Sequence, residues 1–151
     1  MKRRKIRSLS VSEIGMGCMG FSHGYGQVPG AGYAEEAIRE AFGYGCNFFD
    51  TAEGYGKELY YPGHNEEIVG RAVRGFRNEV VIATKLHIRP EAVEDCGSVY
   101  AAVRRHLERS LKNLQIDYVD LYYLHRINME VDNLEAVSYT HLRAHETLAN
   151  L

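Results

Sequence analysis

The chain has 151 residues, of which 45% are hydrophobic and 25% are charged, and its formal net charge is −2. This length predicts one domain, and this composition is typical of a soluble globular protein rather than a disordered one. The near balance of charge gives no electrostatic reason to expect nucleic-acid or membrane binding, and no apolar run is long enough to span a membrane.

The N-terminal segment predicts a small hairpin. No apolar stretch follows the basic KRRK at residues 2–5, so we interpret it as a solvated strand end rather than a signal peptide or a nuclear address. A polar turn at residues 8–10 separates weakly alternating segments, and the second one runs into a first strand over residues 11–16.

Apolar residues at helical spacing then predict three helices, over residues 32–45, 64–75 and 98–114. Asn65 and Ser98 are good N-cap residues for the second and third of them. Glycines close the first two helices, where a helix commonly ends.

Between these helices lie short segments that are almost wholly apolar, and they predict strands over residues 46–50, 80–85 and 118–125. Such strands are buried on both faces, as in a parallel sheet covered by helices. The alternating order therefore predicts an α/β fold, either a doubly wound nucleotide-binding sheet or a (β/α)8 barrel.

The motif GMGCMG at residues 15–20 fits the G-x-G-x-x-G pattern of the doubly wound fold. In that fold the glycines open directly into a helix that meets a pyrophosphate. Here a glycine-rich loop follows, and the first helix begins only near residues 31–33. We therefore favour the barrel.

Polar side chains stand at the predicted carboxyl ends of successive strands, where the active groups of a barrel gather. Asp50, Lys85 and His125 end three strands, and Tyr55 lies in the loop after the first of these. Each residue has an ordinary structural explanation by itself. Their equivalent positions favour an active site.

These residues lie in a set of motifs that occurs in one order along the chain. The set comprises GMGCMGFS, FFDTAEGYG, NEEIVGRAV, ATK, LKNLQIDYVDL and LYYLHR. Together they resemble the aldo-keto reductases over residues 1–136, and the variant GCMGFSHGYG resembles their broad-substrate bacterial, fungal and plant branch. The resemblance implies a TIM barrel and a cytoplasmic oxidoreductase that reduces aldehydes and ketones with NADPH, NADH not being excluded. The three cysteines, odd in number and without metal-type spacing, also suit a reducing compartment.

The resemblance also implies the catalytic roles. Tyr55 is the general acid for the carbonyl oxygen, Lys85 tunes it, and Asp50 pairs with Lys85. His125 hydrogen-bonds the carbonyl group and orients it. This division suits hydride transfer, which needs a proton donor at the developing alkoxide, because an ammonium beside a phenol makes it a better acid.

For the cofactor, the resemblance places the main chain around Gly17, Cys18 and Met19, with Asp50, beside the nicotinamide ribose. The first loop is a weaker candidate for the substrate-pocket wall, through Phe21, His23 and Tyr25. In the enlarged loop after Tyr55, we interpret Tyr60 and Tyr61 as packing residues rather than stacking groups.

A complete barrel needs about 250 residues and eight strands, but only four barrel strands are predicted here. The family contacts to the carboxamide and the adenosine phosphates have no counterpart. We therefore predict the N-terminal half of a barrel: a hairpin, about four strands and three helices, inactive by itself.

The last residues break the pattern. VSYTHLRAHET lacks the apolar spacing of a fourth barrel helix, and it is the in-frame translation of a nucleotide string that resembles a transposase sequencing adapter. We predict domain boundaries of 1–136 for the half barrel and 137–151 for a non-native tail. His141 and His145 are accordingly not interpreted as a metal pair.

Two other functions were weighed. A non-catalytic nucleotide-binding module, resembling channel-associated subunits, would use the same scaffold without turnover. A metal-dependent hydrolase would use Asp50, His64, His87 and His125, but the sequence lacks the usual H-x-H pair and would place Lys85 beside the metal. We predict no metal, and a small carbonyl compound as the partner.

Overall fold

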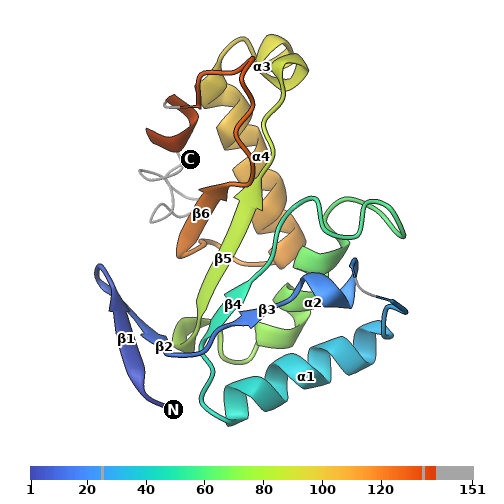
Figure 1. The fold of residues 1–151 in the computed structure, drawn as a ribbon, viewed down its shortest axis with the longest axis vertical. Coiled ribbons are helices and arrows are strands. Elements are labelled where there is room, and N and C mark those ends of the chain that lie inside the picture. Colours follow the sequence, from blue (N-terminus) through green and yellow to red (C-terminus); the bar gives the residue numbers. More distant parts are fainter. Residues whose placement is uncertain (25, 134, 139–151) are drawn as a thin grey trace.

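A parallel sheet carries the fold of this chain (Figure 1). The computed structural model describes residues 1–24, 26–133 and 135–138. Within them, the sheet has the strand order β3-β4-β5-β6. Its strands are β3 (Met16–Gly17), β4 (Phe48–Asp50), β5 (Val81–Leu86) and β6 (Leu121–Leu124). All pairs are parallel, as their apolar sequences predicted.

The register brings the carboxyl ends of the strands to one edge of the sheet. Gly17 on β3 pairs with Asp50 on β4, and Lys85 on β5 pairs with Tyr123 on β6. Phe49 and Ile82 are completely buried at the centre of the sheet, so a slip would expose them. The apolar core therefore holds the strand ends in place.

Three helices cover the sheet, and α2 (His64–Val73) lies between α1 (Ala31–Gly43) and α4 (Val99–Leu114) (Figure 1). Their buried stripes include Ile38, Ile68 and Leu107. Ser98 caps α4 as predicted, because its hydroxyl accepts a hydrogen bond from the Ala101 amide. None of the described helices is both long and apolar enough to cross a membrane.

The helix α2 packs very closely against the end of α4. A Cβ atom at Gly70 would lie 2.0 Å from the Leu114 carbonyl oxygen, so only glycine fits there. This contact fixes how far α2 can shift along the sheet, and α2 carries residues that support the strand ends.

The hairpin of β1 (Arg3–Ile6) and β2 (Leu9–Ser12) lies near the opposite, amino-terminal end of the sheet (Figure 1). Asn47, just before β4, joins it to the sheet. Its side chain accepts from the Ser12 amide at 2.6 Å and donates to the Ser10 carbonyl at 3.0 Å. The hairpin is therefore remote from the strand ends that carry the polar residues.

Several element predictions need correction. The single strand expected over residues 11–16 is interrupted, because the Ser12 hydroxyl turns the chain by donating to the Ile14 carbonyl. Asn65 is not the cap of α2: Gly63 takes that position with a φ of +93°, and Asn65 is buried in the first turn. Gly63 can adopt this left-handed backbone without a cap side chain.

A further helix, α3 (Pro90–Cys96), was not predicted. Proline occupies its first turn and Gly97 ends it in the left-handed conformation, but no residue in it is fully buried. Its apolar residues Ala92, Val93 and Cys96 are half-buried against the core, but the segment is too short to show the helical spacing that identified the other helices. The chain also forms two short 3-10 turns, η1 (Met19–Phe21) and η2 (Arg77–Glu79).

The doubly wound alternative is wrong for this chain. The glycines of GMGCMG form the end of β3 and the turn η1, and the first α-helix begins at Ala31. Among the described residues no α-helix begins at this motif, so it lacks the context that dinucleotide binding of that type requires.

Candidate active site

The structure brings together the polar residues predicted at the strand ends. Asp50 is the last residue of β4, Lys85 lies near the end of β5, and His125 follows β6 directly. The amide of His125 donates to the Leu86 carbonyl at 2.8 Å, which extends the ladder by one bond. Tyr55 enters from the turn after β4.

Lys85 is the centre of this cluster. Its Nζ donates hydrogen bonds to Asp50 Oδ1, to the Thr51 carbonyl at 2.7 Å and to Tyr55 Oη at 3.3 Å. The side chains of Lys85 and Asp50 are only 15% and 28% exposed. A largely buried ammonium needs such partners, and this pairing accounts for a carboxylate at the end of an apolar strand.

His125 lies against the other side of Tyr55. The two rings meet edge to face, with centroids 5.5 Å apart and an interplanar angle of 84°. Burial lowers the pKa of His125, and the positive charges of Lys85 and Arg126 lower it further. The imidazole is therefore neutral at neutral pH, with one N–H free to donate to a ligand oxygen.

A pocket of about 350 Å³ opens over these groups. Its lining includes Met19, His23, Tyr55, Lys57, His87 and His125. It therefore contains the phenol and the imidazole that a docked carbonyl group would have to reach. Of the weaker first-loop candidates, His23 lines the pocket, Phe21 packs against the core, and Tyr25 lies outside the described residues.

The predicted cofactor-binding residues lie beside the cluster, at the end of β3. The Cys18 amide donates to the Asp50 carbonyl at 2.8 Å, which joins this segment to the site. The Cys18 side chain is completely buried, and burial, followed by the nearby Asp50, raises its thiol pKa to about 12. It is thus a neutral core residue that supports the site: the whole residue is buried, and its carbonyl accepts a hydrogen bond from Asn65. A Cβ atom at Gly17 would contact nothing within 4 Å, so the surface there is open.

Sequence reasoning missed the role of Asn65. Its side chain accepts from the Thr51 hydroxyl at 2.7 Å and donates to the Cys18 carbonyl at 2.9 Å and to Ser22 Oγ at 2.8 Å. It therefore ties the segments after β3 and β4 to α2. The helix-start pattern identified Asn65 as a polar residue of the right type, but its partners lie 14 to 47 positions away.

Glu53 was also missed. Its carboxylate accepts from the His87 amide at 2.7 Å and lies 2.7 Å from His106 Nδ1, and both acidic and imidazole side chains are buried. This contact joins the turn that carries Tyr55 to the end of β5 and to α4. The motif DTAEGYG contains Glu53, but nothing local indicates a partner on a helix so far along the chain.

The metal-ligand set of the hydrolase alternative is not assembled. Among the described residues, no group of three His, Cys, Asp or Glu side chains is placed to hold a metal ion. His64 is engaged elsewhere, since its Nδ1 lies 2.9 Å from Ser22 Oγ and its ring stacks on Tyr60 at 4.0 Å. Tyr61 donates to Glu67 at 2.8 Å, so both loop tyrosines make intramolecular packing contacts. His141 and His145 lie outside the described residues.

The sequence pattern of the aldo/keto reductase family matches residues 13–147. This chain belongs to the aldo/keto reductase family. The match overlaps the segment from Val137 onward, so the boundary between half barrel and tail stays a prediction.

Named relatives of this aldo/keto reductase chain agree with that assignment. A probable aldo-keto reductase 1 of Glycine max is 36% identical over 135 residues, which are 87% of this chain and 37% of the relative. The aldo-keto reductase yakc [NADP(+)] of Schizosaccharomyces pombe is 38% identical over 84% of this chain and 37% of its own length. The chain thus spans well under half of these curated relatives.

A solved structure gives the same result for the fold. The holo form of the aldo-keto reductase AKR11C1 from Bacillus halodurans is similar with a TM-score of 0.71 and 31% identity, over 90% of this chain and 43% of that one. The prediction of a partial TIM barrel is confirmed. Only the number of helices was too low, because α3 was missed.

Proposed function

We propose that this chain is the N-terminal half of an NADPH-dependent oxidoreductase that reduces aldehydes and ketones to alcohols, with Tyr55 as general acid. The observation that carries the proposal is the meeting of Lys85 Nζ with Tyr55 Oη at 3.3 Å, beside the paired Asp50 carboxylate. A phenol that accepts a hydrogen bond from an ammonium is prepared to lose its own proton, since the resulting phenolate is stabilised.

The roles of the four residues follow from this geometry. A bound nicotinamide supplies the hydride that reaches the carbonyl carbon. Tyr55 donates its proton to the carbonyl oxygen as negative charge develops there. The neutral imidazole of His125 donates a hydrogen bond to the same oxygen and orients it. Asp50 keeps the Lys85 ammonium in place through the reaction.

The cofactor site rests on the end of β3. The open surface at Gly17 and the position of Met19 in the pocket suit a flat ring beside Asp50. Cys18 is completely buried and contributes by support, through the hydrogen bond of its amide to the Asp50 carbonyl. We propose NADPH rather than NADH because the fission yeast relative is named as an NADP(+) enzyme. We also place the protein in the cytoplasm, where its three free cysteines stay reduced.

The half-barrel part of the proposal rests on the exposed side of β6. Tyr123 is 41% exposed, and Ile127 and Met129 just beyond the strand are 74% and 91% exposed. Apolar residues beside an outer strand indicate a surface that further strands cover. We propose that residues 1–136 belong to the enzyme and that residues 137–151 are a non-native tail. Genomic DNA that continues after codon 136 in one open frame, into four more strand–helix units, would support this.

The test of the catalytic assignment is Tyr55→Phe in the longer protein. We expect the rate of aldehyde reduction to fall by about 10²–10⁴-fold, the usual contribution of general acid catalysis. NADPH affinity should change little. The matched control is Tyr60→Phe, because Tyr60 stacks on His64 outside the pocket. A Tyr55→Phe enzyme that keeps most of its rate would show that another group is the acid.

A further inference from the structure

A second pocket adjoins the candidate active site. It has a volume of about 460 Å³ and lies between the turn after β4, the end of β5 and the helices α3 and α4. The two pockets share Gly54, Lys57 and His87 as lining residues. A ligand whose reactive end lies at Tyr55 can therefore extend across these shared residues into the second pocket.

Cationic side chains surround this junction. We call them, together with the imidazole between them, the basic rim; its members are Lys57, His87, Arg89 and Arg126. Among the described residues, neither Arg89 nor Arg126 has a carboxylate within ion-pair distance. Lys57 lies 3.7 Å from Glu58, but both side chains are 47% exposed, and such surface pairs contribute little.

The nearby carboxylates are already engaged. Glu53 is buried against His106, and Glu58 lies 3.2 Å from His23 Nδ1. On the far wall of the second pocket, Asp95 pairs with Arg105 at 3.9 Å, which leaves Glu91 as the remaining acidic lining residue. The basic rim therefore keeps an excess of positive charge.

This positive charge affects the pKa of His87. Burial lowers the pKa of His87, and the charges of Arg89, Lys57 and Arg126 lower it further, with only Glu53 acting in the opposite direction. Its main chain is fixed, because the amide donates to Glu53. A neutral, positioned imidazole near two arginine side chains is suited to an anionic group, which guanidinium can bind through two parallel hydrogen bonds.

We propose that the basic rim binds an anionic group of the substrate, so that the preferred substrates are aldehydes or ketones that carry a carboxylate or phosphate. This inference rests on the proposed function for the position of the carbonyl group at Tyr55. It goes beyond that function, because carbonyl reduction itself needs no charge on the remainder of the substrate.

The first test compares two matched aldehydes in the longer protein: 4-carboxybenzaldehyde and its neutral methyl ester, methyl 4-formylbenzoate. Arg89→Gln should raise KM for the acid by about tenfold, as expected for the loss of one charge-assisted hydrogen bond. Its kcat and the kinetics of the ester should hardly change. Arg104→Gln is the control, because it removes the same charge from an arginine that pairs with Glu108 outside both pockets. Equal kinetics of acid and ester in the parent protein would overturn the inference.

The second test needs no turnover. Benzoate is titrated into the 151-residue chain, with benzamide as the neutral comparison, and the backbone amide signals of His87 and Arg89 are followed by NMR. Saturable shifts with benzoate alone, lost in Arg89→Gln, would support the basic rim even if neither aldehyde reacted, an outcome that would reject only the proposed function. Absence of saturable shifts with benzoate would overturn the inference.

Discussion

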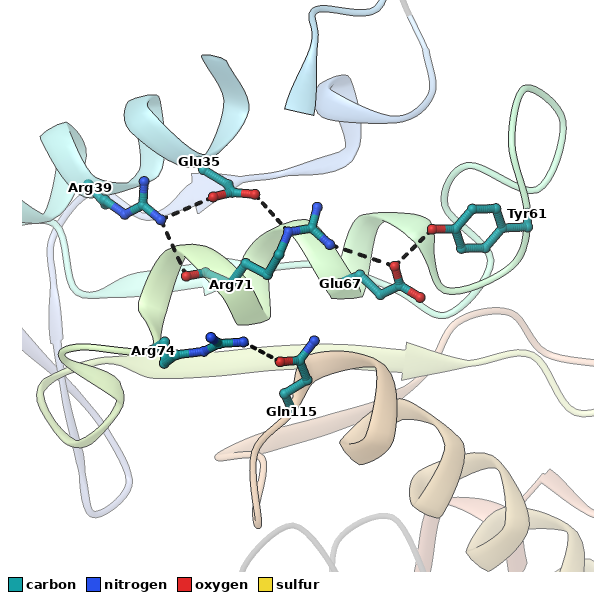
Figure 2. A network of polar contacts seen from close by, with 7 residues as sticks. All are labelled: Glu35, Arg39, Tyr61, Glu67, Arg71, Arg74 and Gln115. Atoms are coloured by element: carbon teal, nitrogen blue, oxygen red, sulfur yellow. Dashed lines mark hydrogen bonds and ion pairs between the residues drawn. The ribbon is translucent and has the colours of Figure 1, made fainter. Parts of the chain in front are cut away.

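Two tyrosines of this chain lie beside side chains of opposite charge. Tyr55 accepts a hydrogen bond from the Lys85 ammonium at the strand ends. Tyr61 donates to the Glu67 carboxylate on the outer side of α2, which raises the pKa of Tyr61 (Figure 2). A phenol beside a cation is favoured as an acid, whereas one that donates to an anion holds its proton more firmly.

The charged groups near the two tyrosines also differ in how far they are buried. Figure 2 shows the outer network, in which Arg71 joins Glu67 and Glu35, at 3.7 and 2.7 Å, across α1 and α2. Arg71 is 34% exposed, more than twice the 15% of Lys85. Charges open to water are solvated with or without a partner, but a buried charge depends on its partner. The comparison teaches that burial, more than residue type, distinguishes the cluster around Lys85 from the exposed ion pairs of the outer network.

The largest expected effect on the free energy of unfolding concerns Asn65, whose hydrogen bonds support the segments after β3 and β4. Asn65→Ala should lower the free energy of unfolding by about 3 kcal/mol, because buried groups on two segments lose their hydrogen-bond partner. Urea unfolding of the chain measures it. Asn78→Ala is the control: within the described residues, the one side-chain hydrogen bond of Asn78 is an exposed one of 3.4 Å from the Tyr118 hydroxyl, so this variant should cost at most about 0.5 kcal/mol. Equal losses would show that Asn65 does not hold the site together.

Lys85→Met tests the buried pair directly. It should cost about 2 kcal/mol of unfolding free energy, less than a fully buried pair loses, because Asp50 keeps some access to water. Adding Asp50→Asn to this variant should restore part of the loss, since it removes the unpaired charge. If the second substitution deepened the loss instead, the pairing would not be the reason for the carboxylate at the end of β4.

The imidazoles around the site predict a dependence of stability on pH. Burial is the main cause that lowers the pKa values of His64, His87 and His125 from their usual 6.5. The unfolded chain then binds these protons more readily than the folded chain, so stability should fall as the pH drops below about 6.5. His125→Gln should flatten this slope, measured by thermal unfolding. Glu66, whose buried carboxyl has a raised pKa and acts in the opposite direction, is present in both proteins and cancels in the difference. An unchanged slope would contradict the assignment.

The smallest effect is expected in the outer network. Arg71→Met should cost only about 0.5 kcal/mol, the scale of an exposed ion pair, and the loss should shrink in high salt. The same salt series on Lys85→Met should show little screening. A large, salt-insensitive cost at Arg71 would remove the distinction between the two regions.

Much of this arrangement could be predicted from local patterns. Apolar runs located β4, β5 and β6, helical spacing located three helices, and the parallel order followed from their alternation. Since parallel strands end at one edge of a sheet, Asp50, Lys85 and His125 could be expected to lie together. The helix α3 was missed because its 7 residues are too few to show helical spacing of apolar positions. The N-terminal strand was predicted too long because the Ser12 hydroxyl turns the chain there.

By itself the sequence determined the order of elements and the residue types at the strand ends, because both depend on periodicity along one segment. Only the tertiary structure decided which distant groups meet: Asn65 with Cys18, Glu53 with His106, and Arg89 with the pocket beside His87. The first two contacts join residues 47 and 53 positions apart. The third depends on how α3 and α4 close around the pocket that Arg89 and His87 both line. Burial and neighbouring charge set the chemistry of a side chain, and both are properties of the folded arrangement rather than of any local stretch.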